Sequence, residues 1–134
     1  MNNLTIREKE NRLMQWWVER MPQTKEIFDN CVKYYEEDEN IGLYNFIGDL
    51  VVVIYDRALE KHDDKTISEF FCVYNDCVNE FKGQFLYNNS EDVLITIAYT
   101  EIFEGTTPKD YKYILKLMPE GVLKDEFKRF AKKV

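Results

Sequence analysis

The chain has 134 residues, of which 45% are hydrophobic and 15% aromatic, and it carries a formal net charge of -7 at pH 7. This length fits one domain with its own core, and the many aromatic residues exclude an intrinsically disordered acidic chain. The negative charge argues against nucleic acid and anionic membranes as partners. We therefore expect a single globular domain over residues 1–134 that binds neither.

Targeting signals and cysteine chemistry are not evident. The opening residues lack the apolar core of a signal peptide, and the longest apolar run, Leu50–Tyr55, is too short to cross a bilayer. Cys31, Cys72 and Cys77 are odd in number and show no CxxC spacing, which speaks against a disulfide framework and a zinc site. We expect a cytoplasmic protein with three reduced thiols that serve mostly as small core residues.

The first half of the chain reads as three helices. Thr5–Glu8 has the form of a capping box, and apolar residues then recur at helical spacing until Pro22. Of the adjacent Trp16 and Trp17 in that helix, either one is core and the other a boundary residue, or the two form an exposed binding pair. A second helix runs on to stop near Gly42, and a third apolar stripe covers residues 43–59, although its middle, residues 51–55, would also suit a strand.

The second half continues the helical pattern. Asp63 or Asp64 is expected to cap a helix whose apolar stripe runs to Phe85, and Ser90 to start a fifth helix that ends with Phe103. Thr107-Pro108 begins a sixth helix, which Pro119 ends before a last, basic one. No hairpin is predicted. The fold class is therefore all-α, a single-domain irregular bundle of about six to seven helices.

Acidic residues are concentrated in the middle of the sequence. Between Glu26 and Glu104 there are eighteen Asp and Glu against five Lys and Arg, whereas both ends are basic. Such a middle speeds association with a cationic partner by electrostatic steering. Two predicted helices carry acids at intervals of seven and four residues, and in an antiparallel hairpin the two stripes would lie side by side, with Val53 and Val73 inside them. Ordinary solvated helix faces are the alternative interpretation. The stripes are Asp49, Asp56 and Glu60, then Glu69, Asp76 and Glu80.

The sequence offers no catalytic, metal-binding or cofactor-binding motif. Its only histidine, His62, lies in a charged interhelix turn, which fits a solvated surface residue better than a di-iron ligand or a catalytic base. Residues 36–40 lack the central glycine of a calcium loop, and the glycines are isolated rather than clustered in a phosphate loop. We expect no catalytic residues, no cofactor and no metal. An enzyme would instead show a deep cleft with carboxylates of raised pKa.

Two segments carry a resemblance to a known class of proteins. FIGDLVVVIYDRALEKHDDKTISEFFCVYNDCVNEF and EDVLITIAYTEIFEG, followed by a pair of short helices with a proline, make the chain from Ile41 onward resemble small all-helical bacterial immunity proteins. Such proteins belong to contact-dependent growth inhibition and similar polymorphic toxin systems. The resemblance implies stoichiometric binding to a cognate toxin domain, often a cationic nuclease, and neutralisation by covering its active site or displacing RNA.

An acidic helical surface suits such a partner, because an RNase displays Lys, Arg and His where it holds phosphate. We expect a monomer that forms a 1:1 heterodimer with a basic toxin domain. The alternative is a cytosolic helical adaptor or regulatory domain that binds another protein and has no toxin partner. Glu101 also stands at a position that matches the resemblance, but a buried structural carboxylate is the alternative interpretation, and Glu101 is left out of the contact set. The expected contact residues are Glu36, Glu37, Asp38, Glu39, Asp56, Glu60, Asp63, Glu69, Asp76 and Glu80, with Tyr34, Tyr35 and Tyr44 as anchors.

Overall fold

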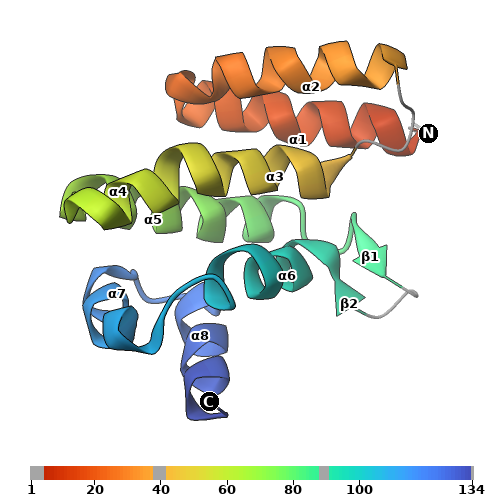
Figure 1. The fold of residues 1–134 in the computed structure, drawn as a ribbon. Coiled ribbons are helices and arrows are strands. Elements are labelled where there is room, and N and C mark those ends of the chain that lie inside the picture. The colour runs from red at the N-terminus through yellow and green to blue at the C-terminus, as the bar shows by residue number, and fades with distance from the viewer. Residues whose placement is uncertain (1–4, 38–41, 88–90, 134) are drawn as a thin grey trace. The chain divides into compact units, whose positions relative to one another are not determined.

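The computed structural model describes residues 5–37, 42–87 and 91–133, with only the backbone described at residues 34–37 and 87. The protein is all-α, as the sequence predicts (Figure 1). It contains two compact units, Met1–Leu50 and Val51–Val134, a subdivision that the sequence analysis did not predict.

The first unit consists of α1 (Ile6–Arg20), the 3₁₀ helix η1 (Pro22–Thr24), α2 (Lys25–Glu37) and α3 (Leu43–Leu50). The predicted capping box is present, because the Glu8 amide donates to Thr5 Oγ1 at 3.1 Å and the Thr5 amide to Glu8 Oε1 at 3.2 Å. Trp17 is fully buried and Trp16 is half-buried, which confirms the core-and-boundary interpretation of this pair. Pro22 follows the C-cap residue Met21 and separates α1 from α2.

The second unit begins with η2 (Val51–Asp56), α4 (Arg57–Lys61) and α5 (Asp64–Glu80). The segment that would also suit a strand is helical, but η2 is a π-helix, which apolar periodicity did not predict. His62 takes a left-handed conformation between α4 and α5, and the two helices pack against each other (Figure 1). Asp63 is the N-cap of α5, since its Oδ1 accepts from the Thr66 amide at 3.2 Å.

The rest of this unit comprises β1 (Leu86–Tyr87), β2 (Glu91–Asp92), α6 (Val93–Ile97), the π-helix η3 (Ala98–Phe103), the 3₁₀ helix η4 (Pro108–Asp110), α7 (Tyr111–Leu117) and α8 (Val122–Lys132). Its core is aromatic. Tyr55 meets Phe71 edge-on at 5.5 Å between ring centroids, and Phe103 lies 5.1 Å from Phe127.

Two predicted boundaries were wrong. The helix expected to carry the apolar stripe to Phe85 ends at Glu80, and a turn with Gly83 at φ 78° follows. The fifth helix begins at Val93 rather than near Ser90, which lies outside the described residues. Its N-cap is Asp92, whose Oδ1 accepts from the Leu94 amide at 2.8 Å. Before this helix, β1 and β2 pair in an antiparallel hairpin that was not predicted, with Leu86 opposite Asp92 and Tyr87 opposite Glu91.

The structure also describes the three cysteines and the helices that the sequence analysis considered for membrane spanning. All three cysteines are free thiols, with Cys31 and Cys77 buried and Cys72 exposed. Within residues 5–37, 42–87 and 91–133, no helix combines the length and the apolar character that crossing a membrane would require.

Candidate functional site: an acidic pocket

A pocket of about 510 Å³ opens on the second unit, beside the C-terminal end of α4. Three of its residues carry carboxylates and one is a lysine. We call it the acidic pocket. Its lining consists of Asp56, Leu59, Glu60, His62, Gly105, Thr107, Lys109 and Asp110.

Hydrogen bonds in the core hold the two walls of the acidic pocket together. Tyr55, the neighbour of Asp56 in η2, is buried and its hydroxyl lies 2.7 Å from that of Thr106. The Thr106 hydroxyl also lies 2.8 Å from the Ile102 carbonyl oxygen, to which it donates. The first bond therefore joins the end of η2 to the segment that follows η3 and supplies Gly105 and Thr107. Burial raises the pKa of Tyr55 to about 12, so its hydroxyl stays protonated and keeps this bond at physiological pH.

Asp56 is the electrostatic centre of the acidic pocket. Burial raises the pKa of its carboxyl, and the neighbouring carboxylates of Glu60 and Glu101 raise it further. Glu101 belongs to the π-helix η3 and acts on Asp56 although it does not line the pocket. The carboxylates of Asp56, Glu60 and Glu101 have neither an ion pair nor a hydrogen bond to another side chain in the part of the chain that the structure describes.

The rim of the acidic pocket is more fully bonded. His62 is exposed, as predicted, and its ring stacks on that of Tyr113 at 4.7 Å between centroids. The Tyr113 hydroxyl donates to the Asp64 carboxylate, and Asp110 Oδ2 accepts from the Thr107 hydroxyl at 3.1 Å. Asp63 accepts from both the Thr66 hydroxyl and its amide, and these bonds hold the pKa of Asp63 below its usual range.

The structure brings only part of the predicted contact set together. Asp56 and Glu60 line the acidic pocket, and Asp63 follows His62 directly. The α5 residues Glu69, Asp76 and Glu80 are exposed, but no residue of α5 is among those that line the pocket in the described chain. The two predicted stripes thus differ in their surroundings, since Asp56 and Glu60 of the first line the acidic pocket and the described residues of the second do not.

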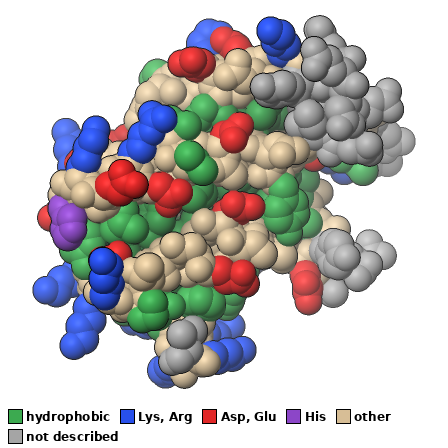
Figure 2. Space-filling view, in the orientation of Figure 1, with side chains coloured by type: hydrophobic (Ala, Val, Ile, Leu, Met, Phe, Trp, Pro, Cys, Tyr) green, Lys and Arg blue, Asp and Glu red, His purple; other side chains and the backbone are tan. Residues whose placement is uncertain are grey.

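The apolar members expected inside the stripes also differ. Val53 is 37% exposed, whereas Val73 is only 5% exposed and is therefore a core residue. The exposed residue between Glu69 and Asp76 is Cys72, one position earlier on the helix. Figure 2 shows that acidic side chains on the face drawn stand among apolar and uncharged ones, a mixture that suits a protein-binding surface.

The remaining predicted contacts lie in the first unit. Tyr44 is exposed and keeps 46% of its accessible surface. Asp49, which belongs to the first predicted stripe but not to the contact set, is exposed as well. Asp38 and Glu39 lie outside the described residues, and so do the side chains of Tyr34, Tyr35, Glu36 and Glu37.

The sequence did not predict the wall of the acidic pocket that residues 105–110 form. Glu101 is outside the expected contact set, and so are Lys109, Asp110 and Thr107, which the sequence predicts only as the start of a helix. No periodic pattern connects these residues to Asp56 and Glu60, because they come from separate elements about fifty positions later in the chain. The Tyr55–Thr106 bond joins the two segments in the fold.

Chemically, the acidic pocket is suited to a cation. An ammonium or guanidinium group would supply the positive charge that could pair with the carboxylates of Asp56, Glu60 and Glu101. Among the residues that the structure describes, no three His, Cys, Asp or Glu are grouped so that they could hold a metal ion. Comparison with protein-family models, curated proteins and solved structures found no match to this chain.

Proposed function

We propose that this protein is a cytosolic immunity protein that binds a cognate cationic toxin domain, an RNase, in a 1:1 complex. The acidic pocket and the exposed acidic residues of α5 form its contact surface. The observation that carries the proposal is the group of carboxylates at Asp56, Glu60 and Glu101, in which Glu60 and Glu101 each repel Asp56 and none has a cation paired with it in the described chain.

The energetics of this group favour a charged partner. Carboxylates that are partly desolvated beside like charges are in an unfavourable state, and an incoming Lys or Arg relieves both the repulsion and the lost hydration. An RNase presents such side chains around its phosphate-binding site. Occupying them would block access of RNA, which is a sufficient mechanism for neutralisation.

The α5 residues Glu69, Asp76 and Glu80 contribute in a different way. They are exposed, so pairs formed there gain little stability but do influence the rate of encounter. The pocket would then determine how long the complex lasts, and the α5 residues how fast it forms.

The first experiment is a pull-down at low salt with the tagged protein from its source lysate, followed by identification of stoichiometric partners. A basic nuclease domain encoded beside this gene is the expected result. A stoichiometric partner that is not basic, with no toxin encoded nearby, would instead favour an adaptor or regulatory domain.

Two neutralising substitutions then test the pocket. Asp56→Asn with Glu60→Gln should speed dissociation of the partner by about tenfold or more, because at least one charge-assisted hydrogen bond is lost. The matched control, Glu19→Gln with Glu26→Gln, changes the net charge equally at exposed positions of the first unit and should leave dissociation unchanged. Equal dissociation rates for the two variants would exclude the acidic pocket from the interface.

A charge reversal tests α5 separately. Asp76→Lys with Glu80→Lys should slow association by about tenfold at low salt while leaving the dissociation rate nearly constant. Stopped-flow association measured over a salt series checks this. Unchanged association kinetics would remove α5 from the contact surface.

A further inference from the structure

A second hollow, of about 410 Å³, lies in the same unit between α6, the start of η3 and α8. Ile95 and Tyr99 supply much of its apolar surface, and the hydroxyls of Thr96 and Thr100 also border it. Glu91 and Asp92 on β2 and Glu126 on α8 contribute carboxylates. We call this hollow the acceptor groove.

The hydroxyl hydrogens of the acceptor groove are already used. Thr96 donates to the Asp92 carbonyl oxygen at 3.2 Å, and Thr100 to the Ile97 carbonyl oxygen at 3.2 Å. The Tyr99 hydroxyl donates to Glu126 Oε2 at 2.7 Å. What these hydroxyls still offer a ligand is the lone pairs of their oxygens, so the side chains of this groove can accept hydrogen bonds but have none left to donate.

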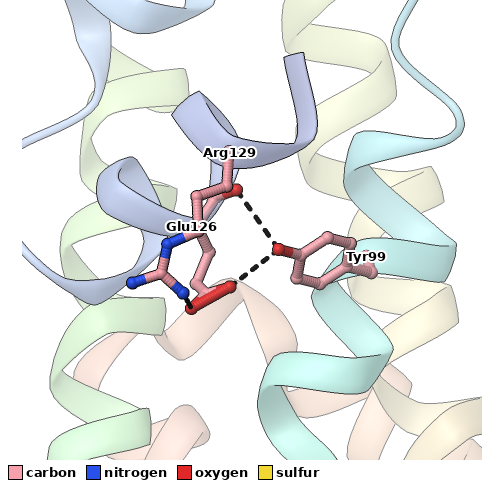
Figure 3. Close-up of polar contacts among 3 residues, drawn as sticks. All are labelled: Tyr99, Glu126 and Arg129. Atoms are coloured by element: carbon pink, nitrogen blue, oxygen red, sulfur yellow. Dashed lines mark hydrogen bonds and ion pairs between the residues drawn. The ribbon is translucent and has the colours of Figure 1, made fainter. Parts of the chain in front are cut away.

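One carboxylate of the groove is fixed in place. Figure 3 shows Tyr99 pointing from η3 toward Glu126 on α8, with Arg129 on the other side of the carboxylate. Arg129 Nη1 donates to Glu126 Oε1 at 2.9 Å, and the Glu126 side chain is only 19% exposed. A carboxylate held by two donors keeps its position and orientation, which favours binding because less order is lost when a ligand arrives.

The negative charge of the groove comes mainly from Glu91 and Asp92, because Glu126 forms an ion pair with Arg129. None of its seven lining residues, all within the described ranges, is a lysine, arginine or histidine. Arg129 is committed to Glu126, and Lys82, which acts on Asp92, lies outside the lining. The groove therefore combines acceptors, negative charge and an aromatic ring, and it complements a cation that has several donors.

We infer that the acceptor groove receives an arginine side chain of the partner protein. A guanidinium has five donors in one plane, which suits acceptors arranged around a groove, and its flat face packs on aromatic and aliphatic surface such as Tyr99 and Ile95. The groove also borders a π-helix, in which the Glu104 amide donates to the Tyr99 carbonyl oxygen at 2.9 Å, and such turns are frequent at functional sites. The inference rests on the proposed function only for the identity of the partner.

The test that needs no partner uses short peptides and the full-length chain labelled with ¹⁵N. The peptide acetyl-Leu-Arg-Leu-amide, added up to ~10 mM, should shift the amide signals of Thr96, Tyr99 and Thr100 in a saturable way. The matched peptide with citrulline, which keeps the shape but lacks the charge, should bind about tenfold more weakly. Absent shifts at these amides, equal binding of the citrulline peptide, or equal binding of a lysine peptide would each overturn the inference.

A variant pair connects the groove to the complex. Thr100→Lys places a cation at the exposed edge of the groove and should abolish peptide binding and weaken partner binding about tenfold. Gln84→Lys makes the same charge change at an exposed residue outside the groove and should leave both unchanged. Circular dichroism and thermal melts check that both variants fold. If the partner binds Thr100→Lys normally but loses affinity for the pocket variants, the inference fails while the proposed function stands.

Discussion

At the scale of single residues, two aspartates of the second unit have opposite electrostatic roles. Burial and the carboxylates of Glu60 and Glu101 raise the pKa of Asp56, while hydrogen bonds from Thr66 lower that of Asp63. Asp63 caps a helix and is satisfied within the fold. Among the described residues Asp56 has no such side-chain partner, and its ionised form is a cost to folding that a cation bound in the acidic pocket would offset.

These roles predict opposite effects of pH. A raised pKa means that the folded state holds a proton more readily than the unfolded state, so the stability contributed by Asp56 falls as pH rises from its unfolded pKa through its raised folded one. Asp56→Asn should therefore gain stability relative to the natural protein as pH rises from about 4 to 7. Urea unfolding at several pH values measures this.

The contrasting variant is Asp63→Ala. Because the pKa of Asp63 is lowered, its contribution is present above the unfolded pKa and is lost as pH falls through the folded one. This variant should be destabilised at pH 7 and should approach the natural protein on acidification. If both variants showed the same pH dependence, the environment assigned to Asp56 would be wrong.

At the scale of elements, the helices could be predicted where local signals determine them. The Thr5 capping box, Pro22, the Asp63 cap and Thr107-Pro108 all mark boundaries that the structure confirms. The π-helices η2 and η3 were not predicted, because the apolar spacing was interpreted with the 3.6-residue period of an α-helix. The acidic pocket was only half predictable, because Glu101 and Asp110 reach Asp56 through tertiary packing rather than through any spacing in the sequence.

The start of α8 shows the same dependence on distant residues. Asn75 on α5 is 7% exposed, and its Oδ1 accepts from the Leu123 amide at 3.1 Å, which caps α8 from 48 positions away. Gly121 permits this contact, because a Cβ there would lie 2.8 Å from Asn75 Nδ2 and because its φ of 156° is a conformation almost confined to glycine.

Gly121→Ala should consequently lower the free energy of unfolding by about 2–4 kcal/mol, the sum of backbone strain and a disturbed buried hydrogen bond. Gly83→Ala is the matched control, since Gly83 also has a positive φ of 78° but a Cβ there would meet nothing within 4 Å. It should cost about 1 kcal/mol, from strain alone. Chemical denaturation of both variants compares them, and equal losses would contradict a special role for the Asn75 contact.

At the scale of the whole molecule, the sign of the charge changes along the chain. Residues 26–104 hold eighteen of the 25 acidic residues, whereas the last thirty residues hold eight Lys and Arg against four Asp and Glu. A cationic partner is therefore attracted most strongly to the acidic residues of the middle segment, which include the pocket residues Asp56 and Glu60. This attraction acts over a long range and raises the rate of encounter.

The salt dependence of association follows from this distribution. Raising ionic strength from about 0.05 M to about 0.5 M shortens the Debye length to a few ångströms and should slow association with the cationic partner by about tenfold or more. Dissociation should change much less, because groups inside the acidic pocket and the acceptor groove are poorly screened. Surface plasmon resonance over a salt series separates the two rates.

The charge reversal Asp76→Lys with Glu80→Lys should flatten the salt dependence of association, since these exposed carboxylates act mainly through the long-range field. Association that is insensitive to salt in the natural protein would show that apolar contacts, and not the acidic middle of the chain, direct the encounter.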